Sequence, residues 1–331
     1  AAGVENYAPC PIEVVRHEMA QAHLAGARLL LWGGPDYPAG LMNLPDAPPV
    51  LWAQGDLSLL SRPMIALVGA RNASSLGIRM ARRLAGALAE AGFPVVSGLA
   101  RGIDTAAHEA ALSHGTIAVQ AGGIDVIYPR ENTDLAARIA ASGLRLSEQP
   151  PGMQPLARHF PQRNRIVSGL AHAVVVVEAA PRSGSLITAR NALDQGREVL
   201  AVPGHPLDER AGGCNLLIRE GALLVRGVED VIAALAALPG QRLERAAVRP
   251  AAIPAGCQRS GSHSLHSPVS ATLESASLPH LILDRLSRSP IAEDQVFRDL
   301  GISVREGAPA LLSLELDGRV LRHPGGLLSR A

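Results

Sequence analysis

Four short segments of this chain combine glycine, small hydroxyl side chains and arginine, the residue types that bind phosphate groups. They are residues 69–75 (Gly-Ala-Arg-Asn-Ala-Ser-Ser), 98–104 (Gly-Leu-Ala-Arg-Gly-Ile-Asp), 122–125 (Gly-Gly-Ile-Asp) and 181–185 (Pro-Arg-Ser-Gly-Ser). Glycine lets a phosphate approach the backbone closely, and a helix that begins after such a segment offers free N–H groups. One such segment is equally well explained as a tight turn, but four at one edge of a fold favour an anion-binding site.

A fifth segment, Arg158–Arg165, is rich in arginine and lies in a stretch without acidic residues. No Asp or Glu occurs from Gln149 to Val177, whereas three arginines and two histidines do. Arginine beside the lone aromatic Phe160 suits a polyanion whose bases can stack, as in a nucleic acid. The alternative is a solvated loop that forms salt bridges with other segments.

The residues that could catalyse a reaction or bind a metal show no spacing typical of a known mechanism. Ser183 and Ser185 have no base nearby in the sequence. The carboxylates that could bind a metal are Asp104, Asp125, Glu148 and Glu178. Such carboxylates more often cap helices or pair with arginine. A Walker A lysine and a G-x-G-x-x-G segment are absent, and the three cysteines are far apart, so we expect no cofactor, no metal and no disulfide framework.

The composition is that of a globular protein in which arginine replaces lysine entirely. The chain has 331 residues, 47% of them hydrophobic, and a net charge of +1, enough for one large α/β domain and one or two small ones. All 31 strongly basic residues are arginine, and two Trp, three Tyr and three Phe are too few for an extended stacking platform. Without a long apolar run or a secretory signal, we expect no membrane span and a place in the reducing cytoplasm.

Residues 61–238 alternate short apolar strands with helices, which is the pattern of a parallel sheet. The predicted strands are residues 64–69, 93–97, 116–121, 144–147, 173–178 and 198–202. The predicted helices between them are residues 76–91, 105–113, 135–142 and 186–193. Continuous Val, Ile and Leu runs indicate strands buried on both faces. The fold class is therefore α/β, an extended Rossmann-like, doubly wound and mostly parallel sheet, and the glycine-rich segments follow its strands at the carboxyl edge.

Three further segments flank this domain. Residues 1–60 predict an N-terminal helical segment, over Glu13–Leu31, and a proline-rich connector. Residues 239–278 predict a flexible linker, and residues 279–331 predict a small C-terminal winged-helix domain of three helices and a hairpin. Seven arginines balance seven carboxylates in residues 279–331, which favours a protein-interaction or regulatory role over contact with duplex DNA.

The motifs and their order resemble the DprA/Smf family, the DNA-processing proteins of natural transformation. The matching residues are spread over about half of the chain and are 69–71, 97–104, 107–108, 123–125, 128–129, 132, 147–148, 160–170, 177–179, 183–189, 196–199 and 202–204. The run Phe-Pro-Gln-Arg-Asn-Arg-Ile-Val-Ser-Gly-Leu at residues 160–170 is the longest of them. So many motifs in one order make the resemblance specific.

The resemblance implies a binding protein for single-stranded DNA rather than an enzyme. It also implies protection of incoming DNA, a homodimer, and help in loading the RecA recombinase. In the family the pocket is built by a Gly-x-Arg loop, a Ser-Gly-x-Ala loop and an Arg-Asn-Arg segment, which here supply Arg71, Gly98, Arg101, Arg163, Asn164 and Arg165. The phosphate-binding segments add Ser74 and Ser183 as candidates. The dimer contacts of the family map onto residues 214–225, with Asn215 and Leu224 as candidates.

Two other functions remain open. A Rossmann-like nucleoside monophosphate phosphoribohydrolase carries a Pro-Gly-Gly-x-Gly-Thr loop with a Glu shortly after it, whereas residues 181–185 read Pro-Arg-Ser-Gly-Ser. A transcription regulator would use the winged helix to bind duplex DNA with a sequence preference, and the Rossmann-like domain as a sensor. Binding of single strands without sequence preference separates both from the first hypothesis.

Overall fold

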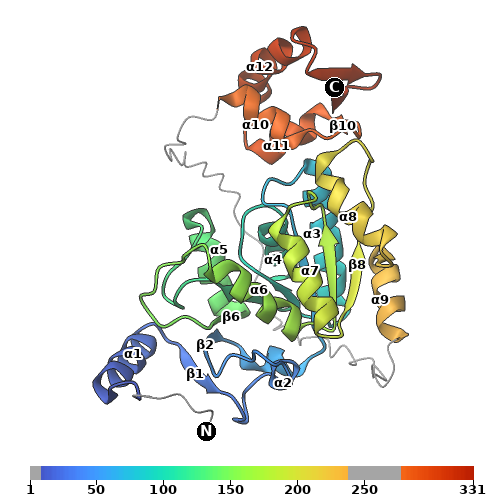
Figure 1. Ribbon diagram of the computed structural model, residues 1–331. Coiled ribbons are helices and arrows are strands. Elements are labelled where there is room, and N and C mark those ends of the chain that lie inside the picture. Colours follow the sequence, from blue (N-terminus) through green and yellow to red (C-terminus); the bar gives the residue numbers. More distant parts are fainter. Residues whose placement is uncertain (1–8, 238–276) are drawn as a thin grey trace, which may run out of the picture.

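The computed structural model describes residues 9–237 and 277–331 of the chain (Figure 1). These residues form an α/β domain around one large sheet and a small C-terminal domain with a three-stranded sheet. The mostly parallel α/β architecture expected from the sequence is confirmed. The predicted linker, residues 239–278, lies outside the described residues except for its last two positions.

The large sheet has nine strands in the order β1-β2-β6-β5-β4-β3-β7-β8-β9. They are β1 Arg28–Leu31, β2 Val50–Gly55, β3 Ile65–Gly69, β4 Val95–Ser97, β5 Thr116–Gln120, β6 Leu144–Ser147, β7 Ala173–Val177, β8 Glu198–Ala201 and β9 Leu223–Leu224. Strands β3 to β9 run parallel, and β1 and β2 are antiparallel additions at one edge. The chain winds outward from β3 to β6 and then returns to β7 on the other side of β3, which makes the gap between β3 and β7 the topological switch point.

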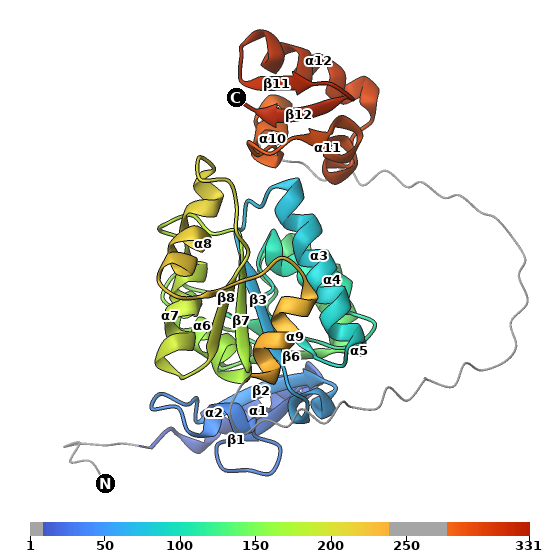
Figure 2. The ribbon, with the colours of Figure 1, turned by 90° about the vertical axis from the view of Figure 1, so that its right-hand side faces the viewer.

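Helices cover both faces of this sheet, which explains why its central strands are apolar throughout. One face packs against α3 Ser75–Glu90, α4 Ile103–Ala111, α5 Thr133–Ser142 and α9 Val228–Ala236. The other face packs against α2 Ala39–Met42, α6 His159–Leu170, α7 Gly184–Asp194 and α8 Glu209–Arg219. Figure 2 shows α3 and α4 on one side of β3 and β7, and α6 to α8 on the other. All five residues of β7 are buried, as a strand covered on both faces must be.

Helix α3 shows how the sequence places a helix end at the switch point. Ala81, Leu84, Ala85 and Leu88 are buried and repeat at the spacing of one helix face. The hydroxyl of Ser74 accepts a hydrogen bond from the N–H of Gly77, so Ser74 is the N-cap. The first turn of α3 therefore begins a few residues after β3 ends.

The N-terminal segment differs from its prediction because it contributes two strands to the sheet. Helix α1, Ile12–Leu24, ends before the predicted Leu31, and β1 follows a turn at Gly26, whose φ is +68°. Strand β2 lies inside the predicted proline-rich connector and pairs with β6, with Trp52 opposite Ser147. Short 3₁₀ helices occur at Leu57–Ser61 and Arg130–Asn132. β1 has only four residues and β2 follows two prolines, so neither carries the local signal of a strand.

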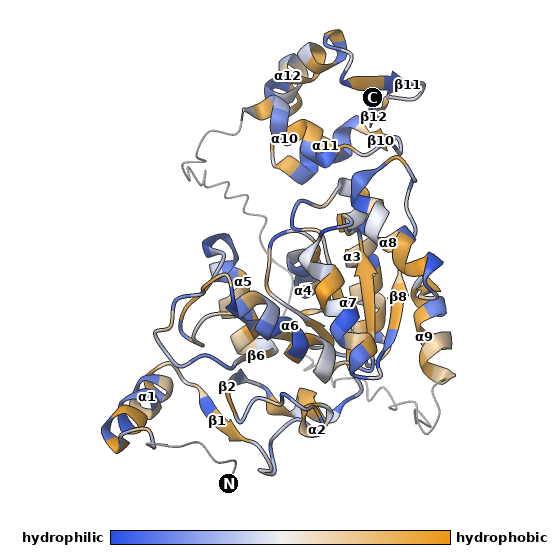
Figure 3. Ribbon diagram, in the orientation of Figure 1, coloured by the Kyte–Doolittle hydropathy of each residue, from blue (hydrophilic) through white to orange (hydrophobic). Residues whose placement is uncertain are grey.

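The C-terminal domain has the three helices and the hairpin of a winged helix. Its helices are α10 Leu278–Arg285, α11 Glu293–Leu300 and α12 Val304–Leu316. Its strands are β10 Ile291–Ala292, β11 Val320–His323 and β12 Leu327–Arg330, in the order β10-β12-β11. Figure 3 shows the alternation of apolar and polar positions along these helices. Across both described parts of the chain, no helix has the length and apolar character needed to cross a membrane.

Candidate functional site

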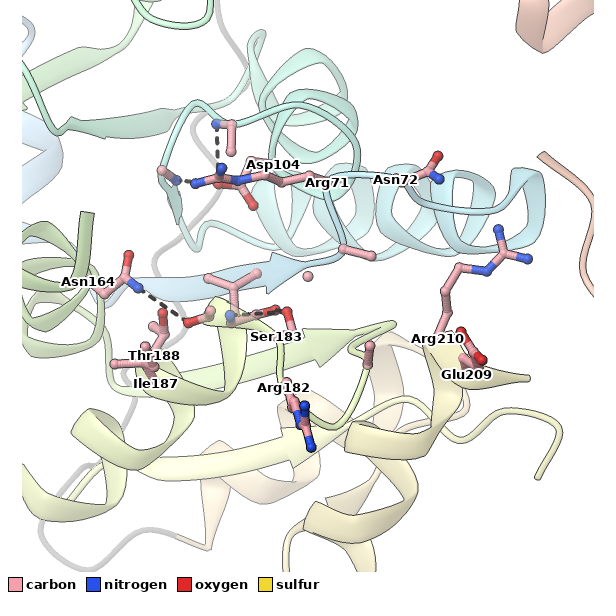
Figure 4. Close-up of a pocket in the computed structure, with 18 of the residues that line it drawn as sticks. Arg71, Asn72, Asp104, Asn164, Arg182, Ser183, Ile187, Thr188, Glu209 and Arg210 are labelled. Atoms are coloured by element: carbon pink, nitrogen blue, oxygen red, sulfur yellow. Dashed lines mark hydrogen bonds between the residues drawn. The ribbon is translucent and has the colours of Figure 1, made fainter. Parts of the chain in front are cut away.

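The loops after β3, β4 and β7 meet at the switch point and surround a cavity of about 970 Å³, here called the main cavity. Arg71 comes from the loop after β3, Gly98 from the loop after β4, and Ser183 from the loop after β7. Helix α6 adds Arg163 and Asn164 to the same lining. Figure 4 shows how Arg71, Asn164 and Ser183 reach the cavity from separate elements. Three of the four segments predicted to bind phosphate thus meet around the main cavity, and residues 122–125 do not line it.

The N-terminus of α7 opens onto the main cavity. Its N-cap is Ser183, whose hydroxyl accepts from the N–H of Ser185 at 3.3 Å and lies 2.6 Å from the Ser185 hydroxyl. Gly184, the first residue of α7, faces open space, since a Cβ there would meet no atom within 4 Å. Asn164 donates to the Gly184 carbonyl at 3.3 Å and ties α6 to this turn. The N–H of Gly184, which has no partner among the described residues, and the positive end of the helix dipole favour an anion at this point.

Arg71 and Arg182 present exposed guanidinium groups to the main cavity. Within residues 9–237 and 277–331, neither forms an ion pair. The guanidinium carbon of Arg71 lies 5.1 Å from the ring centroid of Phe160, a cation–π contact. Tyr128 meets Phe160 edge to face at 5.7 Å. Arg71 therefore places a free cation beside an aromatic pair, the combination that holds phosphates and bases together.

A second, smaller cavity of about 40 Å³ lies beside the aromatic pair, here called the small cavity. Its lining includes Arg101, Gln120 and Tyr128 and shares Arg71 and Phe160 with the main cavity. Arg101 is exposed at its edge and forms an ion pair with Glu131. The side chain of Tyr128 is half exposed, so one face of the aromatic pair is accessible to a ligand.

Arg163 supports the site from inside the fold. It is only 6% exposed, and its Nη1 donates to the Val119 carbonyl at 2.9 Å. Burial lowers the pKa of Arg163 to about 10, Asp104 opposes this shift and Arg71 adds to it, so the guanidinium is charged at neutral pH. Gly98 is required beneath it, because a Cβ at Gly98 would overlap the Arg163 guanidinium. The Nε of Arg163 has no hydrogen-bond partner among the described residues.

Asp104 braces the loop after β4. Its carboxylate accepts from the N–H groups of Gly98 and Ala100 at 3.0 and 3.3 Å. Burial raises the pKa of Asp104, and the Arg163 guanidinium counteracts that shift. Leu99, between the two donors, has a φ of +56°, a conformation rare outside glycine, so the brace holds a strained turn in place.

His108 stabilises the same loop, and its ring is neutral. Its Nε2 accepts from the N–H of Leu99 at 3.3 Å, and its Nδ1 lies 2.7 Å from the Thr116 hydroxyl, which donates to the Val95 carbonyl. These contacts place the single ring proton on Nδ1. Burial, reinforced by Arg163, lowers the pKa of His108 to about 3.

Glu178 connects the loop after β7 to the start of α3. Its carboxylate accepts from the N–H of Ser74 at 2.8 Å and also from the Ser74 hydroxyl. Burial raises the pKa of Glu178, although the bonds from Ser74 lower it. A Cβ at Gly77 would overlap this carboxylate, which explains the glycine. Ser74 is 1% exposed, so it positions two elements instead of facing the cavity.

Arginine side chains outnumber carboxylates around the main cavity. The six arginines are Arg71, Arg163, Arg182, Arg210, Arg288 and Arg330. The four carboxylates are Asp104, Asp208, Glu209 and Asp284. The lining therefore carries an excess of two positive side chains, in a protein whose total net charge is +1. Such a concave positive surface attracts polyanions.

The predicted site residues fall into four groups. Arg71, Gly98, Arg163, Asn164 and Ser183 line the main cavity. Arg101 lines the small cavity, and Ser74 is buried behind the site. Arg165 lines neither cavity, because it bonds to Asp46 at 3.1 Å and to Glu148 at 2.6 Å. Its guanidinium holds the N-terminal segment against the end of β6.

Three arginines of the main cavity were not identified from the sequence. Arg210 comes from α8, and Arg288 and Arg330 come from the C-terminal domain. No local motif distinguishes them, because their position depends on how the two domains meet. In the described part of the chain, no group of His, Cys, Asp or Glu side chains is arranged to hold a metal.

The two candidate dimer residues lie near the free edge of the sheet. Asn215 accepts from the Gly204 N–H at 3.2 Å and donates to its carbonyl at 3.0 Å, so its side chain is used within the chain. Leu224 lies on β9, the last strand of the sheet, and is 43% exposed. The neighbouring Leu223 is 44% exposed. An edge strand of this kind leaves backbone N–H and C=O groups without a neighbouring strand.

Comparison with known families gives two matches. Residues 28–236 match the family described as DNA recombination-mediator protein A, and residues 266–326 match the DprA winged helix domain. The chain is 49% identical over 199 residues to the DNA processing protein DprA of Streptococcus pneumoniae, covering 60% of this chain and 70% of that protein. It is 37% identical over 313 residues to the protein Smf of Synechocystis, covering 88% and 77%.

Solved structures of related proteins indicate the same family. The X-ray structure of DprA from Streptococcus pneumoniae superimposes with a TM-score of 0.61 at 45% identity, covering 64% of this chain and 77% of that one. A structure of DNA processing protein A from Helicobacter pylori, solved for its single-stranded DNA binding mode, gives a TM-score of 0.58 at 32% identity and covers 63% and 95%. By these matches, the chain belongs to the DprA/Smf family of DNA recombination-mediator proteins.

Proposed function

We propose that this chain binds single-stranded DNA in the main cavity and acts as a binding protein, not an enzyme, in DNA processing during transformation and recombination. The observation that carries the proposal is that one cavity is lined by two exposed, unpaired arginines, Arg71 against an aromatic pair and Arg182 just before the N-terminus of α7. The single-stranded DNA binding mode described for the Helicobacter pylori protein supports it.

The contacts divide into phosphate and base contacts. Arg71, Arg182 and the N–H of Gly184 at the start of α7 hold successive phosphates, because they are free donors of the cavity among the described residues. Phe160 and Tyr128 offer ring faces to the bases. None of these groups reads a base edge, so binding tolerates any sequence. A duplex keeps its bases stacked inside and cannot use the aromatic pair.

The finer parts of the proposal concern partners and organisation. The protein protects incoming single strands, forms a homodimer through the β9 edge near Asn215 and Leu224, helps load the RecA recombinase, and works in the cytoplasm. Its parts are an N-terminal segment (1–60), a DNA-binding domain (61–238), a linker (239–278) and a winged helix (279–331). If the chain loads RecA, RecA filaments should begin to grow sooner on single-stranded DNA when the chain is present.

A matched pair of double variants tests the site. Arg71→Ala/Arg182→Ala should weaken binding of a labelled oligothymidine by about tenfold or more, because a charge-assisted hydrogen bond contributes about 1.5–3 kcal/mol. Arg83→Ala/Arg138→Ala removes the same charge from exposed positions on α3 and α5 that line neither cavity, and should change affinity little. Fluorescence anisotropy measures both.

Equal affinity of the two double variants would show that the main cavity is not the binding site. Release of ribose phosphate from nucleoside monophosphates would instead support the phosphoribohydrolase alternative. A preference for one duplex sequence would support the transcription-regulator alternative.

A further inference from the structure

The winged-helix domain is docked at the rim of the main cavity by specific contacts. Arg210 of α8 donates to the Asp284 carbonyl at 2.7 Å and to the Leu286 carbonyl. Arg285 of α10 donates to the Ala73 carbonyl at 3.3 Å, just before α3. Leu76 of α3 packs against the apolar core of the winged helix. Figures 1 and 2 both show the domain above the ends of α3 and α8.

This docking turns the winged helix into one wall of the main cavity. Its side chains in the lining are Asp284, Arg288 and Arg330. Arg288 and Arg330 are exposed, and within the described residues neither side chain has a hydrogen-bond or ion-pair partner. They are thus available to a ligand in the same way as Arg71 and Arg182 on the opposite wall.

The neutral total charge of the winged helix hides an uneven distribution. Glu293 and Glu315 are both paired with Arg322, and Glu306 is held in the capping box of α12. None of these three carboxylates lines the cavity, where two free arginines face one aspartate. The balanced composition that argued against DNA contact therefore does not describe the face that meets the cavity.

We propose that the winged helix supplies the second wall of a composite single-strand site. In this arrangement Arg288 and Arg330 bind backbone phosphates of the strand as it leaves the loops after β3 and β7. Arg210 is a positioning residue, because its guanidinium is taken up by two carbonyls of the winged helix and by Asp208. The proposal rests on the proposed function, since it extends the same strand along the same cavity.

The test compares three variants over oligothymidines of increasing length at several salt concentrations. Each phosphate contact to a single strand contributes about 0.7 to the slope of log affinity against log salt. Arg288→Ala/Arg330→Ala should therefore lower the slope by about 1.4 for long oligonucleotides and leave the shortest bound ones unchanged. Arg210→Ala should lower the slope as well, because it removes two hydrogen bonds that hold the winged helix at the rim of the main cavity. Arg305→Ala/Arg319→Ala, at exposed winged-helix positions outside the cavity lining, is the control.

The outcomes separate this inference from the proposed function. An unchanged slope for Arg288→Ala/Arg330→Ala at all lengths, while Arg71→Ala/Arg182→Ala still loses binding, overturns the composite site and leaves the proposed function intact. Tighter binding by Arg210→Ala also overturns it, since the winged helix would then cover the cavity instead of extending it. No binding of any oligonucleotide by the unsubstituted chain overturns both.

Discussion

At the scale of residues, the arginines of this site have two different roles, ligand binding and support of the fold. Arg71 and Arg182 are exposed and unpaired within the described parts of the chain, whereas Arg163 is buried on Gly98 and Arg165 is held by two carboxylates. Arg165 is thus occupied by its two carboxylates, and Arg163 is only 6% exposed, so both are less available to a phosphate than Arg71 and Arg182. Substitution of Arg163 is therefore a test of the fold as much as of DNA binding.

The contact between Gly98 and Arg163 gives a prediction for stability. Gly98→Ala should lower the free energy of unfolding by about 1–3 kcal/mol, because the added methyl group overlaps the Arg163 guanidinium. Gly184→Ala lines the same cavity but meets only open space, so it should change stability by no more than about 0.5 kcal/mol. Urea denaturation of both variants measures the difference, and equal stability would contradict the packing described here.

The buried His108 gives a prediction for pH. Its pKa is about 3 in the fold against an ordinary 6.5, so between these values the unfolded chain binds a proton that the folded chain does not. Acidification through this window should therefore destabilise the protein, by up to about 1.4 kcal/mol per pH unit from this ring.

Comparison with His108→Gln isolates that effect, because all other titrating groups are common to both proteins. The difference in unfolding free energy between the two should shrink steadily as the pH falls below 6.5. A difference that stays constant from pH 7.5 to pH 4.5 would mean that the ring is not held neutral.

At the scale of elements, the central strands were predictable because each is an uninterrupted apolar run. β7, Ala173–Val177, has no polar residue and can be stable only between two helix layers. β1 was missed because it has only four residues, and β2 was missed because it directly follows Pro48 and Pro49. Their place is decided by pairing with β6, a long-range contact that no local pattern encodes.

Helix α6 was not expected, for a different reason. Its first turns read His-Phe-Pro-Gln-Arg-Asn-Arg and contain little of the apolar repeat that signals a helix. Pro161 is tolerated because it lies in the first turn, where its missing N–H has no helical partner. The arginine-rich segment was thus identified by its charge, but the burial of Arg163 required the three-dimensional structure.

The free edge at β9 gives a prediction for assembly. If the proposed dimer forms there, Leu224→Arg should convert it to a monomer, because a charge replaces an apolar side chain at the pairing surface. Leu193→Arg, on the exposed face of α7 and 58% exposed, is the matched control and should remain dimeric. Sedimentation velocity distinguishes the species, and a dimer that survives Leu224→Arg would place the interface elsewhere.

At the scale of the whole molecule, the site depends on how distant segments meet. The loop arginines were visible in the sequence as motifs, but Arg210, Arg288 and Arg330 reach the main cavity only because the winged helix docks on α3 and α8. Nothing in residues 277–331 alone indicates which face meets the sheet domain. By composition the winged helix is neutral, whereas in the docked structure its face toward the main cavity carries the free Arg288 and Arg330.

The central claim is that the main cavity holds the backbone of a single strand, and one titration tests it most directly. Fluorescent single-stranded and duplex oligonucleotides of several sequences are titrated with the full chain by anisotropy at two salt concentrations. Because binding depends on phosphates, the account predicts tight binding of the single strand that weakens steeply with salt, varies little with sequence and exceeds binding of the duplex. Single-strand binding that is absent, insensitive to salt or weaker than duplex binding would contradict it.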